Sequence, residues 1–119
     1  ALESSTRRPS IFAPNEGDYK PNYHGDLRTR DAAYHQGTVW PWLIGPWVDA
    51  GTDRRSGGAD VLDGLVDHLD DWGLGSISET ADGDAPHGAT GCPFQAWSVA
   101  ETLRARRVLT RPSPPSRVV

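Results

Sequence analysis

The sequence predicts an all-α protein. Three segments carry helical patterns, long stretches rich in Gly and Pro separate them, and no segment alternates polar and apolar residues as a strand would. The 119 residues include 13 Gly and 10 Pro, and only 36% are hydrophobic, so long loops around a small core are expected. Three such helices would leave the Trp-rich first one half uncovered. We therefore expect this chain to be a fragment of a larger helical domain and not a stable, cooperative domain on its own.

The first helix is expected over residues 39–48. Thr38 is a suitable N-cap, and Pro41 is tolerated in a first helical turn. The segment is apolar on nearly all sides, as in a helix buried within a larger assembly. Pro46 is predicted to kink it, with Gly45 easing the bend.

Two further helices complete the prediction. Residues 59–72 place one apolar stripe at helical spacing, and Gly73 would end this helix; the stripe is Val61, Leu62, Leu65, Val66, Leu69 and Trp72. The last helix would start near Pro93, with one apolar face formed by Ala96, Val99, Ala100 and Leu103. Around them we expect an irregular loop at 1–33, helices and loops at 34–108, and a disordered tail at 109–119.

Composition excludes several classes of function. The net charge of −4 argues against nucleic acid as a main partner. No apolar run approaches the roughly 18 residues of a membrane span, so no membrane partner is expected. The single cysteine, Cys92, excludes an internal disulfide and fits a reducing compartment. His24, His35, His87 and Cys92 lack the spacing of metal ligands, so neither a metal nor a cofactor is expected.

Residues 34–42 are the first candidate binding segment. They hold Tyr34, His35, Gln36, Trp40 and Trp42 within nine positions. Flat aromatic faces stack on sugar rings, while amide and imidazole groups bind sugar hydroxyls. The alternative is that the tryptophans are simply core residues. His35 and Gln36 favour a pocket more strongly, because polar side chains beside a buried helix need partners.

The loop at 73–91 is the second candidate segment. Its carboxylates, Glu79, Asp82 and Asp84, could bind a metal or act as acid and base. The calcium-loop pattern does not fit, because Ala81, Ala85 and Pro86 interrupt it. Asp82 followed by Gly83 is also the commonest signal for a tight turn, and Glu79 alone could be an ordinary surface carboxylate.

Both segments resemble signatures of the bacterial amylo-α-1,6-glucosidase type of glycogen-debranching enzyme. The first match is RDAAYHQGTVWPWLIGP at residues 30–46. The second comprises GLGSISE at 73–79, DGDAPH at 82–87 and GCPFQAWSVAE at 91–101. Order and spacing agree with the family. The sequence departs from it at Thr80 and Ala81, where bulky apolar residues are usual, at the short polar stretch 51–58, and throughout 1–13.

The resemblance implies the C-terminal fragment of an (α/α)6 toroid that hydrolyses α-1,6-glucosidic branch points with inversion. It implies that Glu79 is the general base and that the general acid lies upstream of this chain. Glycogen or another branched α-glucan would be the substrate, and the upstream part of the same chain a partner, in the cytoplasm. Six residues are expected to contact sugar: Tyr34, His35, Gln36, Trp40, Gln95 and Trp97. The alternatives are another glycosidase of this fold, such as a trehalase or glucoamylase relative, and a non-catalytic remnant that binds maltooligosaccharides.

Overall fold

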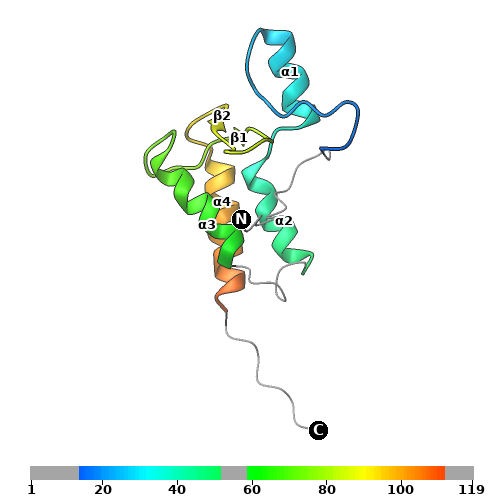
Figure 1. Ribbon diagram of the computed structural model, residues 1–119. Coiled ribbons are helices and arrows are strands. Elements are labelled where there is room, and N and C mark those ends of the chain that lie inside the picture. Colours follow the sequence, from blue (N-terminus) through cyan, green and yellow to red (C-terminus); the bar gives the residue numbers. More distant parts are fainter. Residues whose placement is uncertain (1–13, 52–58, 112–119) are drawn as a thin grey trace, which may run out of the picture.

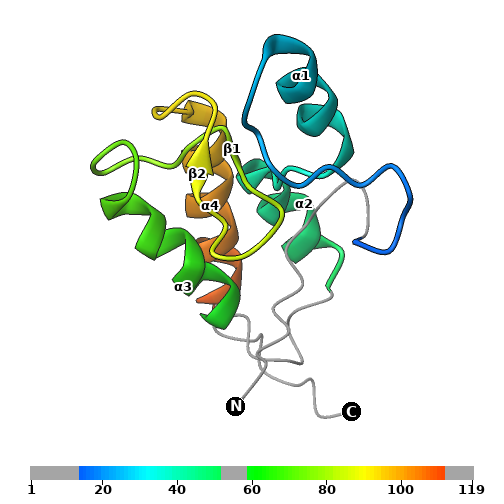
Figure 2. The same cartoon turned by 45° about the horizontal axis from the view of Figure 1, so that its top comes forward.

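The computed structural model describes residues 14–51 and 59–111, and these are mostly helical (Figure 1). Helices α2, α3 and α4 lie beside one another, a two-stranded sheet lies near one end of them, and α1 projects beyond that end (Figures 1 and 2). The regular structure of the described residues is therefore mainly helical, as predicted, apart from this small sheet. The (α/α)6 toroid remains a prediction, because 119 residues are too few to form one.

Helix α1 spans Leu27–Gln36, where the sequence predicted a loop as far as residue 33. Asp26 caps its start, accepting a 2.8 Å hydrogen bond from the backbone N–H of Thr29. The prediction failed because α1 lacks an apolar stripe: only Ala33 is buried, and Leu27 is exposed. Residues 1–13 of the predicted loop lie outside the described residues.

The predicted helix over 39–48 is two shorter elements, a 3-10 turn η1 at Pro41–Leu43 and helix α2 at Ile44–Asp49. Trp40, not Thr38, occupies the N-cap position. Pro46 produces no mid-helix kink, because it lies in the first turn of α2, where a backbone N–H has no helical partner to lose.

Helix α3 spans Ala59–Asp67 and continues as the 3-10 turn η2 at His68–Asp70, so the helical region ends before the predicted Trp72. The apolar stripe is only partly buried. Leu62 is buried, whereas Val66 and Trp72 are more than half exposed. The side chain of Val61 lies outside the described part.

Helix α4, Ala96–Leu109, is central to the packing and contacts η1, α2 and α3. It starts after Gln95 and not near Pro93. Its buried residues are Ser98 and Ala105, whereas Ala96, Ala100 and Leu103 of the predicted apolar face are exposed and Val99 is half-buried. The small core consists of Ile44, Val48, Leu62 and Ala105, with Trp47, Leu65, Val108 and Leu109 packed around it. Leu109, assigned to the disordered tail, ends α4, and residues 112–119 lie outside the described residues.

A close contact joins α2 to α4. Gly45 of α2 faces the carboxylate of Glu101, and a Cβ at position 45 would collide with it. Arg104 fixes this carboxylate with a 2.8 Å ion pair and also binds Asp49 at 2.8 Å. The glycine therefore permits the approach of the two helices on which the core depends.

Two short strands interrupt the predicted loop at 73–91. Strand β1, Thr80–Ala81, pairs antiparallel with β2, Ala89–Thr90, in the register Thr80 to Thr90 and Ala81 to Ala89. Val39 forms an additional antiparallel bridge with Ala81. Two-residue strands carry no alternation that a sequence pattern could reveal, so the expectation of no strands was wrong. None of the helices in the described ranges is long and apolar enough to cross a membrane.

Candidate active site around Glu79

Both carboxylate oxygens of Glu79 accept hydrogen bonds. Oε1 accepts from the Tyr34 hydroxyl at 2.6 Å, and Oε2 accepts from the backbone N–H of Cys92 at 3.1 Å. Gly91 has a φ of 70°, and a Cβ there would lie 2.8 Å from Oε2. Glycine at 91 thus allows the β2 side of the loop to approach the half-buried Glu79 side chain.

The backbone around Glu79 is held on both sides. The Glu79 N–H donates to the Cys92 carbonyl at 2.8 Å, and the Gln95 N–H donates to the Ile77 carbonyl at 3.1 Å. Val39 and Ala81 exchange two hydrogen bonds, of 2.8 and 2.9 Å. This Val39–Ala81 bridge connects the two segments that the sequence singled out, which explains how Tyr34 reaches Glu79.

Tyr34 lies in an aromatic cluster with Tyr23, His35 and Trp40. Its ring packs edge-on against Trp40, with centroids 4.4 Å apart, and also contacts His35 at 5.2 Å and Tyr23 at 5.8 Å. The Trp40 indole N–H donates to the Tyr34 carbonyl at 3.2 Å. Desolvation in this cluster, together with the hydrogen bond to Glu79, raises the pKa of the Tyr34 phenol to about 12, so the phenol is a donor at neutral pH.

The other predicted sugar-contacting residues lie at various positions around this cluster. His35 is exposed at the end of α1, beside Tyr34. Gln36 is half-buried, and its Oε1 is buried without a hydrogen-bond partner in the described part of the chain. A buried amide oxygen without a partner is unusual, and the structure gives no other role for this atom.

Gln95 and Trp97 are attached to the site less directly. Gln95 is half-buried and is bound through its backbone to Ile77, two residues before Glu79. Trp97 is 54% exposed and stacks on Trp42, with ring centroids 4.1 Å apart and planes 17° apart. The structure shows no contact between either side chain and Glu79, and their role in sugar binding stays a prediction.

Asp82 connects two loops in a way that sequence reasoning missed. Its Oδ1 accepts from the Tyr23 N–H at 2.8 Å, and its Oδ2 lies 3.0 Å from Nε2 of His24. The tight-turn interpretation considered only the sequence neighbour of Asp82, and both of these partners are more than 50 positions away. No local pattern could have identified them.

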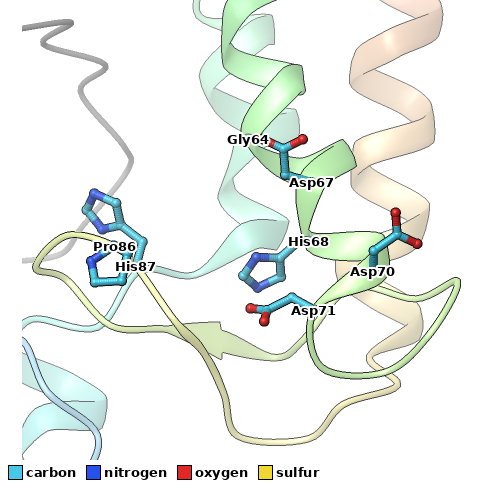
Figure 3. Close-up of a pocket in the computed structure, with 7 residues that line it drawn as sticks. All are labelled: Gly64, Asp67, His68, Asp70, Asp71, Pro86 and His87. Atoms are coloured by element: carbon cyan, nitrogen blue, oxygen red, sulfur yellow. The ribbon is translucent and has the colours of Figure 1, made fainter.

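A polar hollow of about 380 Å³ lies between α3, η2 and the 73–91 loop (Figure 3). It is lined by Gly64, Asp67, His68, Asp70, Asp71, Pro86 and His87. Within residues 14–51 and 59–111, no three His, Cys, Asp or Glu side chains are grouped so that they could hold a metal ion. The hollow therefore offers no metal centre in the described part of the chain.

Glycoside hydrolases act through carboxyl groups, and the aromatic rings beside the Glu79 carboxylate offer apolar faces to a ligand. A family model described as amylo-alpha-1,6-glucosidase matches residues 10–104, which include both candidate segments. The chain therefore belongs to the amylo-alpha-1,6-glucosidase family and is a region of a glycogen-debranching enzyme, as its signatures predicted. Neither a curated protein nor a solved structure gives a significant match.

Proposed function

We propose that Glu79 is the general base of a glucosidase that hydrolyses the α-1,6 branch points of glycogen or a related branched α-glucan with inversion. The observation that carries this proposal is the double hydrogen bond to the Glu79 carboxylate, from the Tyr34 hydroxyl and the Cys92 N–H. These bonds fix the orientation of the carboxylate between the two segments that resemble the family's signatures. Fixed orientation is what a group must have to act on a single water molecule.

The Glu79 carboxylate has acceptor positions left for that water. An ionised carboxylate has about four acceptor positions, and Tyr34 and Cys92 occupy two of them. A water held by a free position would lose its proton to Glu79 as it attacks the anomeric carbon. Tyr34, His35 and Trp40 would form an aromatic wall beside the bound glucose.

The second carboxyl group is expected from an upstream segment of the same domain. In inverting glycosidases the acid and the base stand about 6.5–9.5 Å apart, with room for the water between base and sugar. Several large apolar side chains of this chain are more than half exposed, including Trp72, Phe94, Trp97 and Leu103. We expect further helices of the domain to cover them, since such side chains are normally buried.

The test uses Glu79→Ala in the full-length protein. It is expected to lower kcat by about 10²-fold or more with a much smaller change in KM, because the base acts on water in the transition state. Added azide, which attacks without deprotonation, should restore turnover and give a β-glucosyl azide. Glu16→Gln, which alters an exposed glutamate, is the matched control and should behave as the unaltered protein. Near-normal turnover in Glu79→Ala would remove Glu79 from this role.

Product stereochemistry and substrate range complete the test. Proton NMR should detect β-glucose as the first product, and initial release of α-glucose would exclude inversion. Branched limit dextrin should be the preferred substrate over trehalose and linear maltodextrin. Preference for either of the latter would indicate another glycosidase of this fold. Binding of maltooligosaccharide without any hydrolysis would indicate a non-catalytic remnant.

A further inference from the structure

His68 is bonded to the segment that carries Glu79, and the proposed mechanism does not use it. The residue lies in η2, and its Nε2 is 2.8 Å from Oγ of Ser78, the residue immediately before Glu79. The Ser78 hydroxyl donates to the carbonyl of Thr80, the residue immediately after Glu79, at 2.6 Å. Two side chains thus act on the backbone that brackets Glu79.

The polarity of the His68–Ser78 bond follows from these contacts. A serine hydroxyl has one hydrogen, and a carbonyl oxygen can only accept. Because the Ser78 hydrogen is directed at the Thr80 carbonyl, the bond at 2.8 Å must be donated by Nε2–H of His68. The structure therefore assigns the Nε2-protonated form to His68. His68 donates a hydrogen bond to the Ser78 hydroxyl, and this hydroxyl donates one to the Thr80 carbonyl.

Burial makes this arrangement costly to disturb. Ser78 is 1% exposed, Thr80 is 0% exposed and His68 is 7% exposed. Thr80 is also fixed by a 2.9 Å bond between its hydroxyl and that of Thr90. Water cannot readily replace a lost partner at these positions, so loss of the His68 donor should be relieved by a shift of the 78–80 backbone. Such a shift would move the Glu79 carboxylate away from Tyr34 and Cys92.

We propose that His68 is a positioning residue for Glu79 that acts through Ser78. This inference rests on the proposed function, because it assigns His68 to the orientation of the general base. His68 contacts neither the carboxylate nor the sugar in this role. Figure 3 shows its ring at the wall of the hollow, beside Asp71.

Activity of the full-length protein provides the first test. His68→Leu is expected to lower kcat about 10-fold or more, with KM changed by less than about twofold, since a small misplacement of a reacting group costs rate more than binding. His68→Gln should recover most of the loss, because its amide carries an N–H donor at a similar reach. Asp70→Asn, an exposed change at the same hollow, is the matched control and should retain normal kcat. Normal kcat in His68→Leu, or no recovery in His68→Gln, would overturn the proposal.

A double-mutant cycle tests the route through Ser78. Ser78→Ala removes the acceptor of the His68 bond, so it should lower kcat as His68→Leu does, and the double variant should lose little more than either single one. Multiplied losses would show that His68 acts on Glu79 by another route and would overturn the proposal. If His68→Leu fails to fold, Ser78→Ala tests the proposal on its own. A normal kcat in Ser78→Ala would show that His68 does not act through Ser78.

NMR separates failure of this inference from failure of the proposed function. With isotope-labelled histidine, the nitrogen shifts of His68 should show protonation at Nε2, and the Nε2 resonance should change in Ser78→Ala. The carboxyl carbon resonance of Glu79 is assigned by its loss in Glu79→Gln. This resonance should shift or broaden in His68→Leu, change less in His68→Gln, and stay unchanged in Asp70→Asn. These spectra need no substrate, so they decide the inference even if the protein hydrolyses nothing. A Glu79 carboxyl resonance that is unchanged in His68→Leu would overturn the proposed role of His68.

Discussion

Tyr34 and Glu79 lie 45 positions apart in the chain, and the hydroxyl of the first donates a 2.6 Å hydrogen bond to the carboxylate of the second. One of these residues belongs to the segment expected to bind sugar, and the other is the expected general base. The bond changes the interpretation of Tyr34, whose hydroxyl contacts the proposed base directly.

Removing this hydroxyl should impair turnover. In the full-length protein, Tyr34→Phe is expected to lower kcat about 10-fold, because hydrogen bonds to charged groups contribute about 1.5–3 kcal/mol and this one is made to the proposed base. The aromatic contacts of the ring remain, so KM should change little. Tyr19→Phe is the control, since the Tyr19 hydroxyl makes only an exposed 3.4 Å contact with Asp84. Equal kcat values for the two variants would contradict the orienting role.

Titration of the Tyr34 phenol should also make the stability of the folded protein depend on pH in the alkaline range. Its pKa is raised from 10.0 to about 12 in the folded chain, chiefly by desolvation and then by the Glu79 bond. A raised folded pKa means that the protonated form is favoured by folding, so the contribution is complete below pH 10 and is lost as pH rises toward about 12.

Denaturant unfolding of the unaltered protein and of Tyr34→Phe across this range measures that dependence. The free energy of unfolding of the unaltered protein should fall relative to that of Tyr34→Phe as the pH rises from 10 toward 12. A difference that stays constant through this window would show that the phenol titrates alike in the folded and unfolded chains.

Gly45 should be intolerant of any side chain. Gly45→Ala would place a methyl group against the Glu101 carboxylate, which Arg104 holds in place, so α2 and α4 must separate. We expect a loss of about 1–3 kcal/mol in the free energy of unfolding, the range for overpacked positions. Gly17→Ala is the control, because no atom lies within 4 Å of a Cβ there. A loss no greater than that of Gly17→Ala would show that the interface can relax.

Asp82 and His24 should differ in their contributions to stability although their side chains are in hydrogen-bond contact. Asp82→Ala leaves the Tyr23 N–H without its acceptor in a part-buried position and should cost about 1–3 kcal/mol. The His24 side chain is 70% exposed, so His24→Ala should cost less than about 1 kcal/mol. Thermal unfolding of both variants measures the difference. Equal losses would indicate that the contact between the Asp82 and His24 side chains, and not the bond to the Tyr23 backbone, attaches the two loops.

Much of the local structure could be predicted from the sequence. The apolar segment before Asp49 and the apolar stripe around Leu62 indicated helices, because the positions of apolar residues along a chain reflect which side of a helix is buried. Helix α1 was missed because its formation depends on the Asp26 cap and not on an apolar stripe. The strands were missed because two-residue pairs have no period.

The sequence by itself determined the family of the chain and suggested which residues would carry its chemistry. The signatures around Tyr34 and Glu79 identified the family, because residue types and their spacing can be read from the sequence without knowing where the fold places them. The tertiary structure decided which of these residues meet. The Tyr34–Glu79 bond, the Asp82 contacts with Tyr23 and His24, and the His68–Ser78 relay each join groups ten or more positions apart, and no local pattern encodes them. The physical reason is that a hydrogen bond is made only where packing brings donor and acceptor within about 3 Å, and here the Val39–Ala81 bridge and the packing around α4 set those distances.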